Sequence, residues 1–127
     1  MNVAYVDTSC LVAIAFGERG ATALARRLAA FDTLVASNLL EAELHAAFHR
    51  EGADGAERWL DAISWISPDR PLSPEIAAVL ASGYAGGADC WHLAAALYLS
   101  PEPSDIHFVT MDVRQGAVAK ALGFAAW

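Results

Sequence analysis

The stretch VAYVDTS, residues 3–9, gives the first indication of the fold. Its β-branched and aromatic residues are typical of a short buried strand, and the Thr and Ser that end it favour the start of a helix. Asp7 stands where the strand should end. The stretch IHFVTMD, residues 106–112, has the same form, with a strand predicted over 106–110 and Asp112 at the start of a predicted helix. We therefore expect two buried strands that each lead to an aspartate.

Short apolar runs alternate with helical patterns along the rest of the chain. Further strands are predicted over residues 33–36 and 64–67, with an edge strand over 124–127. Helices are predicted over 10–16, 18–30, 39–50, 54–63, 75–82, 88–99 and 112–122, with loops over 68–74, 83–87 and 101–105. This alternation is typical of an α/β fold around a parallel sheet. Neither proline-rich loop is long enough for a linker, so we expect one domain over residues 1–127.

Composition and charge narrow the class of protein. The chain has 127 residues, of which 56% are hydrophobic and 18% are charged, and this excludes disorder as its main state. No apolar run approaches the ~20 residues that span a bilayer, and we find no signal-peptide pattern. Cys10 and Cys90 do not form a disulfide framework, so we expect a reduced, cytoplasmic protein. The net charge of −7 is unlike that of a protein that binds nucleic acid unaided, but it does not exclude a nucleic-acid enzyme whose bound cations neutralise its acids.

Four acidic residues stand in or beside apolar segments: Asp7, Glu43, Asp89 and Asp112. The carboxyl ends of parallel strands meet at one edge, where open α/β sheets place their sites, so we expect Asp7 and Asp112 to lie together. An ionised carboxylate in apolar surroundings is costly unless it is paired or bound to a metal, and carboxylate oxygens suit Mg²⁺ or Mn²⁺. Each of the three aspartates could instead simply cap the helix that follows it.

The motifs YVDTS, SNLLEAEL, GGADCWHLAAAL and FVTMD, in this order, resemble those of PIN-domain proteins. A chain this short looks most like the VapC-type ribonuclease toxins of toxin–antitoxin modules. The resemblance implies a three-layer α/β/α sandwich with a central parallel sheet, and an endoribonuclease that needs Mg²⁺ or Mn²⁺ to hydrolyse RNA. It assigns the catalytic and metal-binding acids to Asp7, Glu43, Asp89 and Asp112. It further implies a cognate antitoxin that blocks the site, and a homodimer.

Some assignments stay open at this point. Glu41 shares the second motif with Glu43 but lies about 200° away on a helix, so both cannot face one site. The apolar stripe favours Glu43 weakly, and the Glu-Leu pair of the family favours it more. We expect the antitoxin to insert an Arg or Lys among the acids, and the Ala- and Leu-rich faces over 21–30 and 39–48 to supply its groove and a dimer surface. A non-catalytic PIN-fold binding protein is the alternative function.

Several other residues have simpler roles than catalysis or metal binding open to them. His45 and His49 have the spacing of a zinc pair but lack an HExxH pattern, so we do not expect a zinc site. His92, one turn after Asp89, is expected to be a core or supporting histidine. Arg114 is expected to be a solvated helix residue, with a phosphate contact as the alternative. A haloacid-dehalogenase-like phosphatase would need an acid where Ser9 stands, so this class is excluded.

Overall fold

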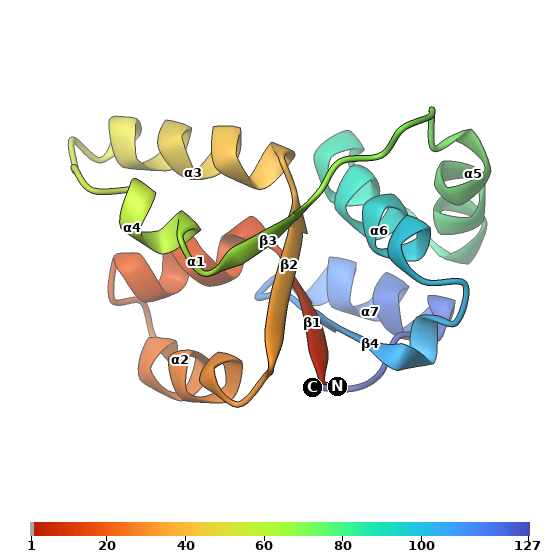
Figure 1. Ribbon diagram of the computed structural model, residues 1–127, viewed down its shortest axis with the longest axis horizontal. Coiled ribbons are helices and arrows are strands. Elements are labelled where there is room, and N and C mark those ends of the chain that lie inside the picture. Colours follow the sequence, from red (N-terminus) through yellow and green to blue (C-terminus); the bar gives the residue numbers. More distant parts are fainter. Residues whose placement is uncertain (1) are drawn as a thin grey trace.

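The computed structural model describes residues 2–127 and has a sheet of four parallel strands at its centre (Figure 1). The strands are β1 (Val3–Val6), β2 (Thr33–Ser37), β3 (Ile63–Ile66) and β4 (Ile106–Val109), and their order across the sheet is β3-β2-β1-β4. The helices are α1 (Thr8–Ala15), α2 (Ala21–Ala29), α3 (Leu39–Arg50), α4 (Glu57–Leu60), α5 (Ser73–Ser82), α6 (Gly87–Leu99) and α7 (Val113–Leu122), with a 3-10 turn at Pro103–Asp105.

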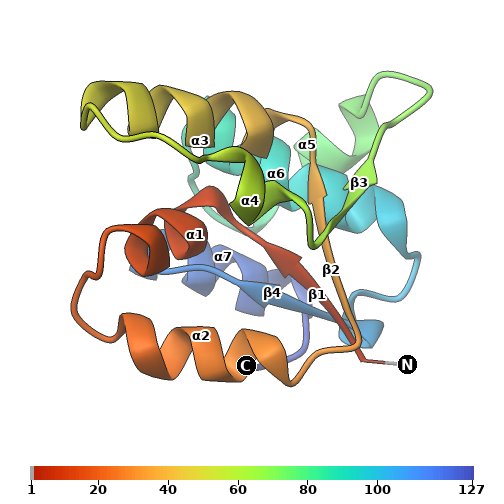
Figure 2. The ribbon, with the colours of Figure 1, turned by 60° about the vertical axis from the view of Figure 1, so that its left-hand side comes forward.

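The helices form one layer on each face of the sheet. Alternate residues of a strand point to opposite faces, and in β1 Ala4 and Val6 pack with the layer α1–α4 whereas Tyr5 packs with α5–α7. Figures 1 and 2 show the two helical layers on either side of the strands. This arrangement confirms the predicted α/β/α sandwich with a central parallel sheet.

The strand order reverses beside β1. The chain moves from β1 to β2 to β3 and then crosses back through α5 and α6 to place β4 on the free side of β1. Val6 pairs with Val109, and the backbone N–H of Asp7 donates to the carbonyl of Val109 at 2.9 Å. The carboxyl ends of β1 and β4 therefore lie side by side at the reversal, which is where open α/β sheets bind ligands.

Several boundaries differ from the sequence prediction. The helix predicted over 10–16 begins two residues earlier, at Thr8, and the helix predicted over 18–30 begins at Ala21. In the second case Gly17 and Gly20 adopt left-handed φ values of 63° and 84°, so the chain turns there before it becomes helical. The helix predicted over 75–82 begins at Ser73, because a proline in the first turn gives up no helical hydrogen bond.

The largest difference concerns the third strand. The helix predicted over 54–63 is a single turn, α4, and the strand predicted over 64–67 begins one residue earlier, at Ile63. Ile63 is buried and pairs with Leu34 of β2, so it belongs to the sheet rather than to the helix. The edge strand predicted over 124–127 is reduced to one bridge between Ala125 and His107.

The exposed apolar surface also differs from expectation. Four of the five leucines in the faces over 21–30 and 39–48 that were expected to form a groove are buried in the core, namely Leu24, Leu28, Leu40 and Leu44, and Leu39 is half-buried. Large exposed apolar side chains lie elsewhere, two of them on and after α5, and within the described residues they are Trp65, Leu80, Tyr84, Leu99, Met111 and Val113. Within the described residues 2–127, no helix is both long enough and apolar enough to cross a membrane.

Candidate active site

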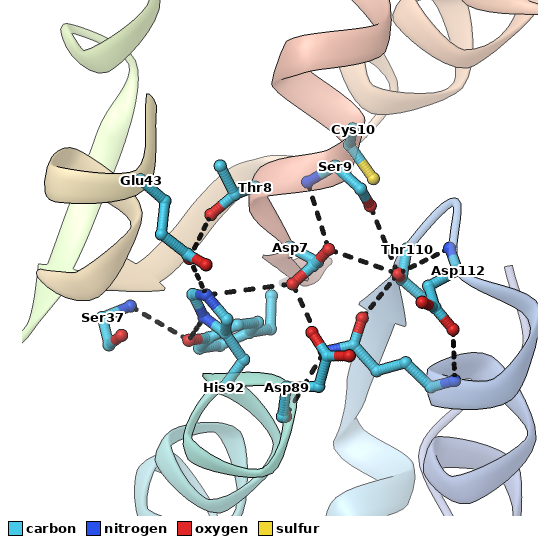
Figure 3. A network of polar contacts seen from close by, with 12 residues as sticks. Asp7, Thr8, Ser9, Cys10, Ser37, Glu43, Asp89, His92, Thr110 and Asp112 are labelled. Carbon is cyan, nitrogen blue, oxygen red and sulfur yellow. Dashed lines mark hydrogen bonds and ion pairs between the residues drawn. The ribbon is translucent and has the colours of Figure 1, made fainter. Parts of the chain in front are cut away.

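The four acids singled out in the sequence occupy the same edge of the sheet. Asp7 and Asp112 follow β1 and β4, Glu43 lies on α3, and Asp89 lies in the first turn of α6. Figure 3 shows the carboxyl groups of Asp7 and Asp89 close to one another, with Glu43 on one side and Asp112 on the other. Acids from both helical layers and from two strand ends thus meet at the point where the strand order reverses.

Two of these acids also cap helices. The carboxylate of Asp7 accepts from the backbone N–H of Ser9 at 3.1 Å, and that of Asp112 accepts from the N–H of Gln115 at 2.8 Å. These bonds satisfy amides that the first turns of α1 and α7 would otherwise leave unpaired. Capping and a place in the site are therefore compatible, because the cap holds each carboxylate at its strand end.

Asp7 is 5% exposed and is held from several sides. The side-chain amide of Gln115 donates to its Oδ1 at 3.3 Å, and the Thr110 hydroxyl lies 3.4 Å from its Oδ2. The Thr110 hydroxyl donates to Oε1 of the Gln115 side chain at the shorter distance of 2.6 Å, and this leaves the NH₂ end of that amide to face Asp7. The same amide nitrogen lies 3.3 Å from the carbonyl of Asp89. Gln115 therefore ties the ends of β1 and β4 to the start of α6.

Sequence reasoning missed Gln115. A signal was present, because Gln three residues after a capping Asp has the spacing of a capping box, in which it would bond back to the cap residue. Here the backbone N–H of Asp112 donates to the Thr110 hydroxyl at 3.0 Å, and the Gln115 side chain turns inward to Asp7.

Glu43 is the acid of the second motif that faces the site. Its Oε1 accepts from the Thr8 hydroxyl at 2.8 Å and lies 2.6 Å from His92 Nε2. Partial burial acts to raise the pKa of Glu43, but the hydrogen bonds from His92 and Thr8 outweigh it and lower the pKa overall. Glu41 is exposed and lines a different hollow, beside His45 and Trp65.

Asp89 is the least supported of the four carboxylates. Its side chain accepts no hydrogen bond from the other described residues, although its backbone carbonyl contacts Gln115. Burial raises the pKa of Asp89, and the negative charges of Asp7 and Asp112 raise it further. These carboxylates are therefore close enough to repel one another.

The cluster lacks the cations that would normally balance it. Over residues 2–127, no Lys or Arg forms an ion pair with any of the four acids, and His92 Nε2 lies 3.8 Å from Asp7 Oδ1. No three His, Cys, Asp or Glu side chains in that range, His45 and His49 included, are gathered tightly enough to hold an ion as they stand. The donor set still fits a hard divalent cation, because its uncompensated oxygens are of the kind that Mg²⁺ and Mn²⁺ bind.

Buried polar residues are concentrated at this edge. The six buried polar side chains of the described chain all belong to it, namely those of Asp7, Thr8, Ser37, His92, Thr110 and Gln115. Five of them have hydrogen-bond partners, and within residues 2–127 only the Ser37 hydroxyl is buried without one. His92 is fully buried, as expected of a core or supporting histidine.

Arg114 marks the rim of the site. It lies in the first turn of α7, two residues after Asp112, and is exposed. Its guanidinium lies 5.8 Å from the ring centroid of Tyr84, which is 70% exposed and precedes α6. A cation at the start of α7 and an exposed aromatic ring in the loop before α6 thus lie together, near in sequence to Asp112 and Asp89.

Comparison with known proteins gives a family and no individual relative. A search of curated proteins and a search of solved structures each found no match. The family model of the PIN domain matches residues 4–121, which include all four acids, the strands β2, β3 and β4, and all of β1 except Val3. The protein belongs to the PIN-domain family, whose members are commonly nucleases.

Proposed function

We propose that this protein is a metal-dependent endoribonuclease that hydrolyses phosphodiester bonds of RNA. The observation that carries the proposal is the meeting of four acids at one sheet edge, where no Lys or Arg of residues 2–127 is paired to them. A structural ion-pair cluster would contain basic partners, whereas this one has unbalanced negative charge. The protein also belongs to a family whose members are commonly nucleases, and this supports the same conclusion.

We propose that Asp7, Glu43, Asp89 and Asp112 hold Mg²⁺ or Mn²⁺. Such an ion, when bound, lowers the pKa of its water and stabilises negative charge on a phosphate. The caps and Gln115 hold Asp7 and Asp112 in place before anything binds. Glu43 uses Oε1 for its two hydrogen bonds, which leaves Oε2 available as a ligand.

No residue of the site is required as a covalent nucleophile. Cys10 lies three residues after Asp7 and is the cysteine that could act as a nucleophile there. Its thiol, however, is buried and donates to the backbone carbonyl of Val109 at 3.3 Å. Burial raises the pKa of Cys10 to about 12, and the charge of Asp7 acts in the same direction. The thiolate is therefore absent at neutral pH, which supports attack by water instead.

Arg114 and Tyr84 are proposed to receive the RNA at the rim. The net charge of −7 opposes a polyanion, so local cations must offset the repulsion. Arg114 is beside Asp112 and is free of ion pairs within the described residues, so its guanidinium can contact a phosphate. The exposed face of Tyr84 can stack on an unpaired base.

We propose that the protein is the toxin of a toxin–antitoxin module, and that it acts in the cytoplasm. The antitoxin would place an Arg or Lys among the acids and offset their repulsion. An apolar hollow of about 400 Å³ lies close by, lined by Ile76, Leu80, Tyr84 and Trp91 among others, and Trp91 also lines a hollow with Leu39. This surface suits an apolar segment of the inhibitor.

We also propose a homodimer, which rests on the resemblance to VapC-type toxins and on the frequency of symmetric dimers. Light scattering at micromolar concentration tests it, and a monomer would contradict it. Co-expression with the neighbouring small gene tests the antitoxin. Failure to co-purify, or a complex that cuts RNA as fast as the free protein, would overturn the toxin role.

The proposed activity is tested on purified protein and a single-stranded RNA. We expect cleavage with Mn²⁺ or Mg²⁺ and none after chelation, restored when the metal is added back. Equal cleavage in chelator would rule out metal dependence. Mn²⁺ binding without cleavage of any RNA tried would favour the alternative, a PIN fold that only binds partners.

A further inference from the structure

A buried chain of hydrogen bonds links the sheet to Glu43 through His92. His92 lies on α6 and is 0% exposed. Its Nδ1 is 2.7 Å from the hydroxyl of Tyr5 in β1, and its Nε2 is 2.6 Å from Oε1 of Glu43. Figure 3 shows the ring of His92 next to the carboxyl group of Glu43. Both ring nitrogens are therefore engaged, one with the core and one with the site.

The positions of the donors assign the protons along this chain. The backbone N–H of Ser37 donates to the Tyr5 hydroxyl oxygen at 3.2 Å. The phenol oxygen of Tyr5 still has its own proton to donate, and a neutral His92 can accept that proton at Nδ1. A neutral imidazole that accepts at Nδ1 carries its proton on Nε2, and this proton points at Glu43. The bond to Tyr5 at Nδ1 and the bond to the acceptor-only carboxylate of Glu43 at Nε2 are therefore both compatible with this tautomer.

The bond from His92 also joins the two helical layers. Glu43 is on α3, in the layer α1–α4, whereas His92 is on α6, in the opposite layer. The Glu43 side chain is 32% exposed and has three rotatable bonds, so burial alone would not fix it. Thr8 and His92 both bind Oε1, and two donors on one oxygen leave Oε2 facing away from them.

We infer that His92 is a positioning residue that orients Glu43 as a metal ligand, with Tyr5 holding the ring in the donating tautomer. The inference rests on the proposed function in one respect, because it requires Glu43 to bind the metal. Supporting residues that fix a ligand typically change metal affinity when they are removed, even though they do not touch the ion.

The test measures Mn²⁺ binding by electron paramagnetic resonance, without RNA, on folded protein. His92→Leu should weaken Mn²⁺ binding by about tenfold, the lower end of what loss of a supporting residue costs. His92→Gln should recover part of the affinity, because its amide can donate to Glu43. Tyr5→Phe keeps the ring volume and should weaken binding in the same direction but less. Nitrogen NMR of wild type should find the His92 proton on Nε2.

Leu93→Ala is the matched control. Leu93 neighbours His92 on α6 and is equally buried, but it has no bond to the site. Its loss should lower the melting temperature while leaving Mn²⁺ affinity of the folded protein unchanged. A merely structural role for His92 predicts the same behaviour for His92→Leu.

The outcomes separate the inference from the proposed function. Wild-type affinity in His92→Leu would overturn the inference, as would wild-type affinity in Tyr5→Phe if His92→Leu does not fold. A wild-type chain that binds no Mn²⁺ would overturn it too. If His92→Leu binds Mn²⁺ more weakly and wild type cuts no RNA, the inference holds and the proposed activity fails.

Discussion

The two edges of the sheet bury very different side chains. At the carboxyl edge, Asp7, Thr110 and Gln115 are buried and bonded to one another. At the amino edge, a hollow of about 440 Å³ is lined mainly by apolar side chains such as Val3, Val35 and Ile106. The acidic residue that lines this hollow, Asp105, is exposed. A hollow is therefore present at one edge and a polar network at the other.

The difference shows which of the two features identifies a site. A surface hollow between strand ends and a helix end costs little, since it is open to water. Burying hydroxyl, amide and carboxylate groups costs free energy unless nearly every one has a partner. Such a network persists in a small protein when it serves a purpose, and so the carboxyl edge is the candidate active site despite the hollow at the amino edge.

Asp7→Asn gives the largest expected effect. Asn caps a helix about as well as Asp, so the melting temperature should change little. Cleavage of single-stranded RNA in Mn²⁺ should fall by at least about a hundredfold, the scale at which losing one charge-stabilising group lowers a rate. The matched control is Asp105→Asn at the amino edge, which should cut at the wild-type rate. Equal rates for the two variants would remove Asp7 from the proposed ligands.

Gln115→Met tests the network that the amino edge lacks. Met has a similar length but cannot bond to Thr110, Asp7 or the carbonyl of Asp89. The free energy of unfolding should fall by about 2 kcal/mol, because buried polar groups lose their partners. Urea denaturation measures it. Lys120→Met, exposed on the same helix, should change it by less than about 0.5 kcal/mol. A similar small change in Gln115→Met would mean that its bonds contribute little.

Arg114→Ala and Lys120→Ala together compare a cation at the first turn of α7 with a cation at its last turn. Removing the cation beside Asp112 should raise KM for RNA about fivefold, or about 1 kcal/mol, and leave kcat unchanged. The effect should shrink as salt is added, because the charge is exposed and screened. Lys120→Ala removes a cation from the last turn of the same helix and should leave KM unchanged. Steady-state kinetics at two salt concentrations decides between a general charge effect and a local contact.

Asp89→Asn gives the smallest effect and tests the repulsion directly. In metal-free protein at neutral pH, the variant should be more stable by about 0.5 kcal/mol, a small gain because solvent screens this partly exposed group. The folded protein raises the pKa of Asp89 above its ordinary value of 3.8, so ionisation of Asp89 destabilises the fold. The gain should therefore be full at neutral pH and vanish well below pH 3.8, where the carboxyl is protonated in both states.

Added Mn²⁺ should reverse the order of stability, because Asp89→Asn then lacks a ligand that wild type has. Chemical denaturation with and without the metal measures both differences. The control, Asp105→Asn, should show neither. A variant less stable than wild type in chelator would contradict the repulsion among Asp7, Asp89 and Asp112.

The sequence alone determined the elements that bring the strand ends together. The apolar runs before Asp7 and Asp112 predicted two strands, and parallel pairing put both aspartates at one edge without any knowledge of packing. The helix over 39–50 was predicted to the residue. These features follow from local periodicity and capping, which are properties of neighbouring residues. The boundaries near Gly20 and Ile63 could not be predicted from local periodicity, because the turn at Gly20 and the pairing of Ile63 with β2 override local preference.

Only the tertiary structure decided which side chains the edge uses. Glu41 and Glu43 differ by two residues on one helix, and periodicity separated them weakly, whereas the packing of α3 on the sheet turns Glu43 toward His92 and leaves Glu41 in solvent. Gln115 gave only a capping signal, yet its amide joins three elements. Such contacts are set by side chains far apart in the chain, and their free energy depends on the low dielectric and fixed geometry that exist only after the layers have packed.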